Sequence, residues 1–283
     1  MVIARLRRLG FGLATVLGLA PRGFFIPYRY AGAVTPPGGR APYGAMERLF
    51  DGAAAGFRQR LDGLAVYGGA LRAIADAPPP APRWEQDWFP RLDAAMAYAM
   101  VRDYSPKRIV EVGSGHSTRF LARAVADGAA AAGARFIAID PEPRAAIAGL
   151  DVEIIRHTVQ RAGTTPYEGF GVGDILFIDS SHILMPGSDV DFLLNRVMPA
   201  LPAGVVVHIH DIFLPDDYPR SWAWRGYNEQ LAVAALLSGG GYRPLFASRY
   251  AVTRMAEAVA ASAAGGLPII AGALESSLWL EKL

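Results

Sequence analysis

The amino-acid sequence predicts an α/β protein with a mostly parallel, seven-stranded sheet and an N-terminal helical extension. A β-branched run at 108–112 ends at two glycines and leads directly into an alanine-rich helical pattern. This order of strand, tight turn and helix is the first unit of nucleotide-type α/β folds. After it, apolar runs of strand length alternate with helical patterns to the end of the chain. Such alternation predicts a mostly parallel sheet.

Residues 1–90 are predicted to form the extension, and residues 91–283 the main domain. Apolar side chains recur every three or four residues between 46 and 77, which is the spacing of a helix with one buried face. The proline-rich stretch at 78–82 is the best candidate for a boundary, because consecutive prolines make a stiff linker. Another helix is expected at 91–104, where Ser105-Pro106 stops it.

The main domain is predicted to contain seven strands with helices between them. Runs such as 175–178 and 205–207 are apolar throughout, as expected for strands that are buried on both faces. The predicted strands are 108–112, 135–140, 152–158, 174–179, 204–211, 244–252 and 276–281. The predicted helices between them include 118–133, 189–201 and 227–237.

The composition describes a globular protein without an obvious charged partner. Its hydrophobic content is 52% and its charged content 19%. A formal net charge of +2 gives no electrostatic reason to expect nucleic acid as a partner. The chain contains no cysteine, which excludes disulfides and thiolate metal sites. That composition is compatible with a cytoplasmic location.

The glycine turn after the first strand carries the strongest functional signal. Dinucleotide-binding turns follow the pattern GxGxxG and place pyrophosphate on the helix N-terminus, but Thr118 stands at the third glycine position here. Glu111, two residues before Gly113, would repel pyrophosphate and suits a ligand with an ammonium group. The alternative is an ordinary strand–helix turn, in which Gly113 and Gly115 serve packing alone.

The pattern Glu-x-Gly-x-Gly-x-Ser at 111–117 resembles motif I of the class I S-adenosylmethionine (SAM) dependent methyltransferases. Those enzymes have a Rossmann-like sheet of seven strands, the last of them antiparallel, and the resemblance extends from about residue 91 to the C-terminus. It implies that the amino-acid end of SAM is held by Glu111, Gly113, Ser114, Gly115 and Ser117. A side chain at position 113 is expected to block the cofactor.

Two further residues are candidates for binding SAM on the strength of this resemblance. Asp140 ends the second strand, where an acid is expected to accept the ribose hydroxyls. The sequence Asp140-Pro-Glu142 is also a good helix start, so a capping role is an alternative. Thr158, after the third strand, is a positional candidate for contact with adenine.

Acids and histidines end the fourth and fifth predicted strands. Asp179 and His182 follow the fourth strand, and His210 and Asp211 end the fifth. Because the carboxyl ends of neighbouring parallel strands meet at one edge of the sheet, we expect these four residues to form the reaction centre. Histidine is the natural proton acceptor near neutral pH. His208 lies deeper along the fifth strand and is expected to be a core residue.

Asp179 and Asp211 resemble the two acids of the catechol-type O-methyltransferases, which hold Mg²⁺. They also resemble acids in bacterial enzymes that act on antibiotics and sugars, including the cephalosporin-hydroxylase-like group. Here Ile212 replaces the Asn of the catechol-type site, and His210 replaces an acid of the antibiotic branch. Imidazole suits Mn²⁺, Fe²⁺ or Zn²⁺ better than Mg²⁺. Asp179 and Asp211 therefore either hold a divalent metal or orient a histidine base, and we favour the second alternative.

Together these features predict a bacterial enzyme that transfers a methyl group from SAM to a small-molecule acceptor, with oxygen favoured over nitrogen. Two alternatives remain: an NAD(P)-dependent oxidoreductase on the same fold, and a non-catalytic SAM-binding protein. The aromatic segment 214–228 is expected to be either a substrate lid or a surface that covers the sheet edge or joins a homo-oligomer.

The N-terminus resembles a signal peptide, with Arg5, Arg7 and Arg8 before an apolar run at 9–20. That run is 12 residues long and carries three glycines, whereas a membrane-spanning helix needs about 20 apolar residues. An enzyme that uses cytosolic SAM gains nothing from export. We therefore expect an uncleaved, peripheral or packed helix in a cytoplasmic protein, with loose membrane contact through residues 1–20 as the alternative.

Overall fold

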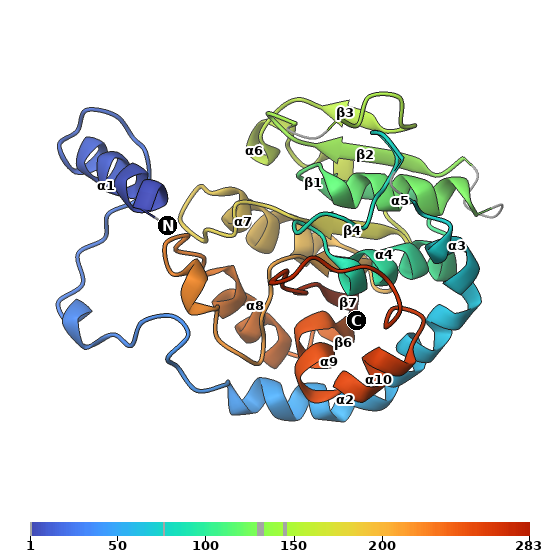
Figure 1. Cartoon of the computed structure of the whole chain (residues 1–283). Helices are drawn as coiled ribbons and strands as arrows, with labels where there is room; N and C mark the ends of the chain where they lie inside the picture. Colours follow the sequence, from blue (N-terminus) through green and yellow to red (C-terminus); the bar gives the residue numbers. More distant parts are fainter. Residues whose placement is uncertain (1, 76, 129–132, 144–145) are drawn as a thin grey trace. The chain divides into compact units, whose positions relative to one another are not determined.

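The computed structural model describes residues 2–75, 77–128, 133–143 and 146–283, with the side chains of the first helix described from residue 6 onward. Seven strands form one sheet in the order β3-β2-β1-β4-β5-β7-β6, with helices packed around it (Figure 1). Strand β7 runs antiparallel to both of its neighbours, while the pairs from β3 to β5 are parallel. The predicted fold class is confirmed.

Strand β1 has its predicted bounds, β2 to β5 lie within the predicted runs, and β6 and β7 overlap theirs with shifted ends. They are β1 Arg108–Val112, β2 Arg135–Ile139, β3 Glu153–Ile155, β4 Ile175–Ile178, β5 Val206–Ile209, β6 Tyr242–Ala247 and β7 Leu278–Lys282. The helices are α1 Val2–Val16, α2 Gly44–Gly63, α3 Gly68–Arg72, α4 Arg91–Tyr104, α5 His116–Ala126, α6 Val159–Ala162, α7 Asp189–Phe192, α8 Glu229–Ser238, α9 Ser248–Arg254 and α10 Ala256–Ala261.

Helix α4 has the predicted bounds, but three other predicted helices differ. The helix predicted at 46–77 is two helices joined by a 3-10 turn at Leu64–Tyr67, next to glycines that weaken a helix. The helix predicted at 189–201 continues from α7 as a π turn and then a 3-10 turn, Met198–Ala200, where Pro199 lacks the N–H that an α-helix needs. Helix α5 ends at Ala126, and residues 129–132 of the predicted helix lie outside the described residues.

The predicted strand 244–252 is wrong in its second half. Strand β6 ends at Ala247, because its partner β7 begins at Leu278 and offers no further residue to pair with. The next residue, Ser248, donates its backbone N–H to the carbonyl oxygen of Ser277 and begins helix α9. The apolar Tyr250 that suggested a longer strand packs instead on Phe50 of α2, with ring centroids 5.7 Å apart.

The chain divides into two compact units, and the division does not follow the predicted boundary at residue 90. Unit 1 consists of residues 1–41 and 217–227, and unit 2 of residues 42–216 and 228–283. Unit 2 includes α2 and the whole sheet, because α2 packs against β6. Most of the aromatic segment 214–228, predicted to be either a lid or a covering or contact surface, belongs to unit 1. Within the described residues, no helix is long and apolar enough to cross a membrane.

The strand order brings the functional candidates of three strands to one edge of the sheet. Strands β1, β4 and β5 are neighbours, and Val112, Ile178 and Ile209 are partners in register. The residues that follow these partners are Gly113, Asp179 and His210. They therefore stand side by side at the carboxyl edge, where ligands bind in open α/β sheets.

Candidate active site

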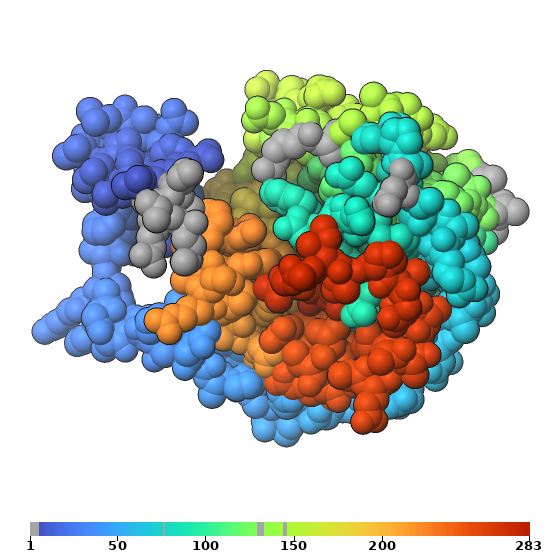
Figure 2. Space-filling model, in the orientation of Figure 1, coloured from blue at the N-terminus to red at the C-terminus, as the bar shows by residue number. Residues whose placement is uncertain are grey.

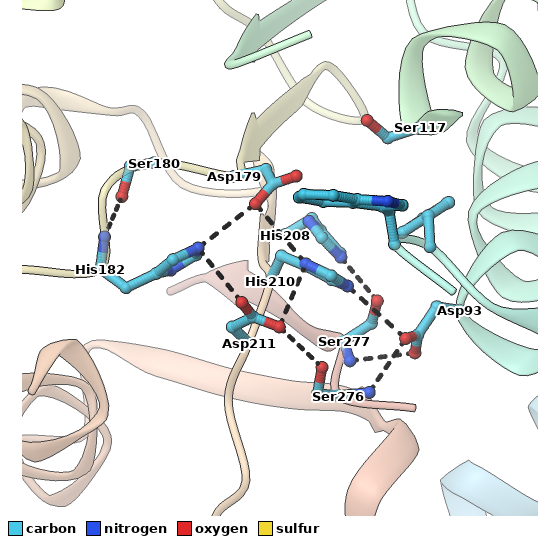
Figure 3. Close-up of polar contacts among 12 residues, drawn as sticks. Asp93, Ser117, Asp179, Ser180, His182, His208, His210, Asp211, Ser276 and Ser277 are labelled. Atoms are coloured by element: carbon cyan, nitrogen blue, oxygen red, sulfur yellow. Dashed lines mark hydrogen bonds and ion pairs between the residues drawn. The ribbon is translucent and has the colours of Figure 1, made fainter. Parts of the chain in front are cut away.

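Two acids and two histidines at the ends of β4 and β5 converge into one cluster (Figure 3). The His182 Nε2 atom lies 3.3 Å from Asp179 Oδ1 and 3.4 Å from Asp211 Oδ2. The His210 Nδ1 atom lies 3.5 Å from Asp179 Oδ1 and 3.5 Å from Asp211 Oδ1. The structure thus brings together all four residues that the sequence suggested for the reaction centre.

The loops that carry His182 and Asp211 have unusual backbone conformations. His182 has φ 59° and Asp211 has φ 56°, in the left-handed region. For residues other than glycine this conformation costs on the order of 1 to 3 kcal/mol, and it persists where surrounding contacts hold it. Such outliers are concentrated at functional sites. The backbone conformation therefore independently indicates His182 and Asp211 as functional candidates.

Helix α8 holds His182 from the side opposite the cluster. The His182 Nδ1 atom lies 2.9 Å from Oε2 of Glu229, a residue that is almost fully buried. The backbone N–H groups of Asn228 and Glu229 both donate to the carbonyl oxygen of His182. Sequence analysis missed Glu229, because nothing in the first turn of a helix distinguishes a buried acid from an ordinary exposed one.

Helix α4 provides a comparable support for His210. The carboxylate of Asp93, buried in α4, accepts the backbone N–H groups of Ser276 and Ser277 at 2.9 and 3.0 Å. It also lies 3.6 Å from His210 Nε2. The Ser276 hydroxyl donates to Asp211 Oδ1 at 3.2 Å. Asp93 and Ser276 were also missed, although an acid on the apolar face of a helix is a usable signal.

The cluster is charged, and one of its acids faces outward. Burial lowers the pKa values of His182 and His210, but the surrounding carboxylates outweigh burial and raise both well above the usual range. Burial also raises the pKa of Asp179, yet the two imidazoles outweigh it and hold that pKa well below the usual value. The Asp179 side chain is 37% exposed, against 9% for Asp211. Asp179 is therefore the ionised group that an incoming molecule can reach.

His208 is a core residue, as expected. It is fully buried, its ring stacks on Phe177 with centroids 3.7 Å apart, and its Nε2 lies 2.8 Å from the Ser277 hydroxyl. Burial and the nearby His210 hold its pKa well below the usual range. His208 therefore stays neutral and supports the strand that carries His210.

Beside this cluster, Glu111 is fully buried at the end of β1. One carboxylate oxygen, Oε1, accepts the Ser117 hydroxyl at 2.6 Å, while Oε2 is buried without a hydrogen-bond partner. Burial raises the pKa of Glu111 to about 8, although hydrogen bonds from Ser117 and Thr118 lower it. A buried acceptor without a partner is costly unless a ligand supplies a donor.

Four buried nitrogen atoms near the start of α5 also lack partners: Arg83 Nε, Trp84 Nε1, His116 Nδ1 and Arg119 Nε. Trp84 is positioned against α5 by Phe120, with ring centroids 5.0 Å apart. Burial lowers the pKa of His116 to about 4, helped by the charges of Arg119 and Arg83. Burial and the positive charge of Arg83 also lower the pKa of Arg119. The Nε atoms of both arginines are thus buried donors without partners, while Arg119 Nη2 donates to the carbonyl oxygen of Ala146 at 3.0 Å.

The remaining predicted cofactor residues are placed as follows. Asp140 follows β2, where Oδ2 accepts the Ser114 hydroxyl at 2.6 Å and Oδ1 accepts the Glu142 backbone N–H at 2.8 Å. Asp140 thus closes a local turn with Glu142, no helix begins there within the described residues, and the ribose role stays a prediction. Thr158 is exposed directly before α6, and its adenine contact also stays a prediction.

Across the described ranges, no group of three or more His, Asp or Glu side chains is placed to hold a metal ion. In the cluster, each histidine lies between carboxylates at ion-pair distance, so a metal would have to displace the protons that balance those charges. Asp179 and Asp211 are ion-pair partners of the two histidines, and their alternative role as metal ligands stays a prediction.

Comparisons with known proteins point to one family. Residues 110–212 match the sequence model of a family described as a methyltransferase domain. A search of curated proteins finds no match. Among solved structures, the chain is similar to an O-methyltransferase from Bacillus cereus in complex with SAH, with 14% identity, 80% of this chain and 90% of that chain covered, and a TM-score of 0.42.

A second similar structure is the O-methyltransferase TomG from Streptomyces achromogenes, involved in tomaymycin synthesis and in complex with SAM. It has 16% identity and a TM-score of 0.35, with 70% of this chain and 89% of that chain covered. The matched segment contains Glu111, the glycine turn, Asp179 and Asp211, whereas Asp93, Glu229 and Ser276 lie outside it.

Proposed function

We propose that this chain is a class I SAM-dependent methyltransferase, supported by the matched methyltransferase-domain segment and the strand order, and that it methylates an oxygen atom of a small-molecule acceptor. The observation that carries the choice of oxygen is the Asp179–His210–Asp211–His182 cluster at the ends of β4 and β5. A hydroxyl must lose a proton as it is methylated, and an imidazole of this cluster can take that proton once it is in its neutral form. An amine acceptor that is already unprotonated needs no such group.

The unpartnered buried atoms fit the amino-acid end of SAM. That end carries an ammonium group and a carboxylate. Glu111 Oε2 is an acceptor without a donor, which suits the ammonium group. The unused donors of Trp84 and Arg119 suit the carboxylate. Gly115 adds room, because a Cβ atom built there would meet nothing within 4 Å.

When bound, SAM supplies a methyl group on a sulfonium centre that a nucleophile can attack in line. The chain's own residues hold the acceptor and take its proton. Asp179, ionised and partly exposed, accepts a hydrogen bond from the acceptor hydroxyl and orients it. The imidazole of His210 or His182 takes the proton. Because both imidazoles hold a proton near neutral pH, the active base form becomes more populated as the pH rises.

Titration calorimetry with SAM and NADH, followed by transfer of a labelled methyl group to a panel of hydroxyl and amine acceptors, tests this proposal. We expect binding of SAM and not of NADH, with label appearing on hydroxyl acceptors. Label on amines alone would overturn the choice of oxygen. SAM binding without transfer to any member of a broad panel would favour the non-catalytic alternative.

Valine substitutions at the two glycines of the turn should have different effects. Gly115→Val should weaken SAM binding tenfold or more, because the side chain enters open space at the crevice and the extended φ of 177° tolerates valine. Gly113→Val should instead lower Tm strongly, because φ is 86° and a Cβ would collide with the Asp179 carbonyl oxygen. The structure thus corrects the expectation that a side chain at 113 acts by filling the cofactor's space. Calorimetry and thermal unfolding separate the two effects, and a well-folded Gly113→Val protein would contradict the second.

Removing divalent ions should leave methyl transfer unchanged. The two histidines lie between the two acids and balance their charges without a metal. We expect enzyme treated with EDTA and then freed of it to retain its initial rate with a hydroxyl acceptor. Recovery of activity only after adding Mn²⁺, Zn²⁺ or Mg²⁺, with no effect of added monovalent salt, would instead make Asp179 and Asp211 metal ligands.

A further inference from the structure

Unit 1 is an arginine-rich segment of the chain. Its residues, 1–41 and 217–227, contain eight arginines and one acid, Asp217. That acid is already paired, because both of its oxygens accept hydrogen bonds from Arg40, at 2.6 and 2.9 Å. All 26 acidic residues of the protein lie beyond residue 46. The positive charge of unit 1 is therefore not balanced within the unit.

The same unit exposes an unusual amount of apolar surface. Leu6, Leu9, Leu13 and Val16 recur along α1 at the spacing of one helical stripe, and each is more than half exposed. The chain after α1 continues this surface with Leu17, Leu19, Phe24, Phe25 and Ile26, all more than 60% exposed (Figure 2, dark blue). Exposed apolar surface of this extent marks an interaction site.

Arginines and apolar side chains are mixed within this surface. The guanidinium carbon of Arg7 lies 5.1 Å from the ring centroid of Phe11, and that of Arg22 lies 5.8 Å from it. Between α1 and the segment 217–227, a cavity of about 580 Å³ is lined by Leu9, Leu13, Val16 and Trp224 together with Arg8 and Arg220. The Arg8 guanidinium also donates to the Ala223 carbonyl oxygen at 3.2 Å. The lining of this cavity is thus both apolar and cationic.

We propose that unit 1 binds the surface of a membrane that contains anionic phospholipids, with α1 lying in the interface. A bilayer of this kind offers both acyl chains for the leucine stripe and phosphates for the arginines. A second copy that packed through the same surface would bring the same positive charge and be repelled. Helix α1 has 15 residues, so it can lie on a bilayer but is too short to span one.

The cavity gives this surface a place for part of a single lipid. An acyl chain fits the apolar lining from α1 and Trp224, and the guanidinium groups of Arg8 and Arg220 suit the phosphate of the same molecule. Both electrostatic attraction and apolar burial then contribute to the free energy of membrane binding. Binding therefore depends on lipid charge and weakens as salt is added.

Flotation of the full-length protein with vesicles tests the proposal. We expect binding to vesicles of phosphatidylcholine mixed with phosphatidylglycerol to be at least tenfold tighter than to phosphatidylcholine alone, and to weaken as salt is added. The double variant Leu9→Glu/Leu13→Glu should lose tenfold or more of the binding to mixed vesicles, since two apolar anchors become charged. Val66→Glu, at an apolar residue of unit 2 that is 79% exposed, is the matched control and should bind as wild type does.

Three results would overturn the proposal: equal binding to both vesicle types, full binding by the double variant, or self-association of the wild-type protein without vesicle binding. The last would make the surface a contact between copies. SAM affinity and thermal unfolding of the double variant should match those of wild type. Vesicle binding does not measure methyl transfer. Failure of the membrane-binding proposal can therefore be distinguished from failure of the proposed methyl transfer.

Discussion

Replacing Glu111 by glutamine should weaken SAM binding by roughly tenfold to a hundredfold, while making the free protein more stable at pH 8. The loss of affinity follows because a neutral amide cannot balance an ammonium group, and hydrogen bonds to charged groups contribute about 1.5 to 3 kcal/mol. The gain in stability follows because the buried carboxylate has an oxygen without a partner. Calorimetry and thermal unfolding measure the two effects on the same sample.

The effect of Glu111 on the stability of the free protein depends on pH, with a defined sign. The pKa of Glu111 is raised from 4.5 to about 8 in the folded protein. Its contribution to stability is therefore fully present below the unfolded pKa and is lost as the pH rises through the folded one. The loss is on the order of a few kcal/mol for a shift of this size. The wild-type protein should lose stability between about pH 4.5 and 8 without SAM, and Glu111→Gln should lose less.

SAM binding has the opposite pH dependence, because the ammonium group needs the carboxylate form. Affinity in the wild type should rise as the pH approaches 8, and Glu111→Gln should remove that rise. Glu168→Gln, at an exposed acid, is the matched control and should change neither profile. Identical pH profiles for wild type and Glu111→Gln would show that this carboxyl neither carries the raised pKa nor meets the cofactor.

The second large effect is expected at His210 and Asp211. Both His210→Ala and Asp211→Asn should lower the methyl-transfer rate by about a hundredfold or more, the order expected for losing general-base help. SAM affinity should stay nearly intact, because the proposed cofactor contacts lie at Glu111 and the glycine turn. Asp211→Asn is the sharper test, since the amide keeps the shape of the side chain and its Oδ1 can still accept from Ser276.

Single-turnover rates, SAM calorimetry and Tm should be measured together on these variants. His157→Ala is the matched control, because His157 is exposed after β3 and lies outside the cluster. If the cluster is merely structural, Asp211→Asn should lower Tm and SAM affinity along with the rate, through buried groups that lose their partners. A rate loss with unchanged Tm and affinity is the result that assigns the cluster to catalysis.

Some of this site could be predicted from the sequence because the signals are local. An apolar run that ends in glycine or an acid reports both a buried strand and its carboxyl end. That is why Glu111, Asp179 and Asp211 could be assigned to one edge of a sheet before their distances were known. The exact bounds of α4 follow from the same kind of signal, since Pro106 stops the helix.

The tertiary structure alone decided what those residues touch. Asp93 and Ser276 lie 183 residues apart in sequence and meet only because α4 packs where β7 begins. Glu229 reaches His182 across 47 residues. The end of β6 and the place of residues 42–90 in unit 2 were likewise set by contacts with distant segments.

The sequence by itself therefore determined the order of strands and helices along the chain and which polar residues stand at strand ends. The tertiary structure decided that two histidines are held between acids, that Glu111 keeps an oxygen without a partner, and that Gly113 is needed for the approach of the Asp179 carbonyl. The physical reason is that periodicity in a sequence reports which faces are buried. The partner of a buried polar group, and hence its charge, depends on which distant segment packs against it.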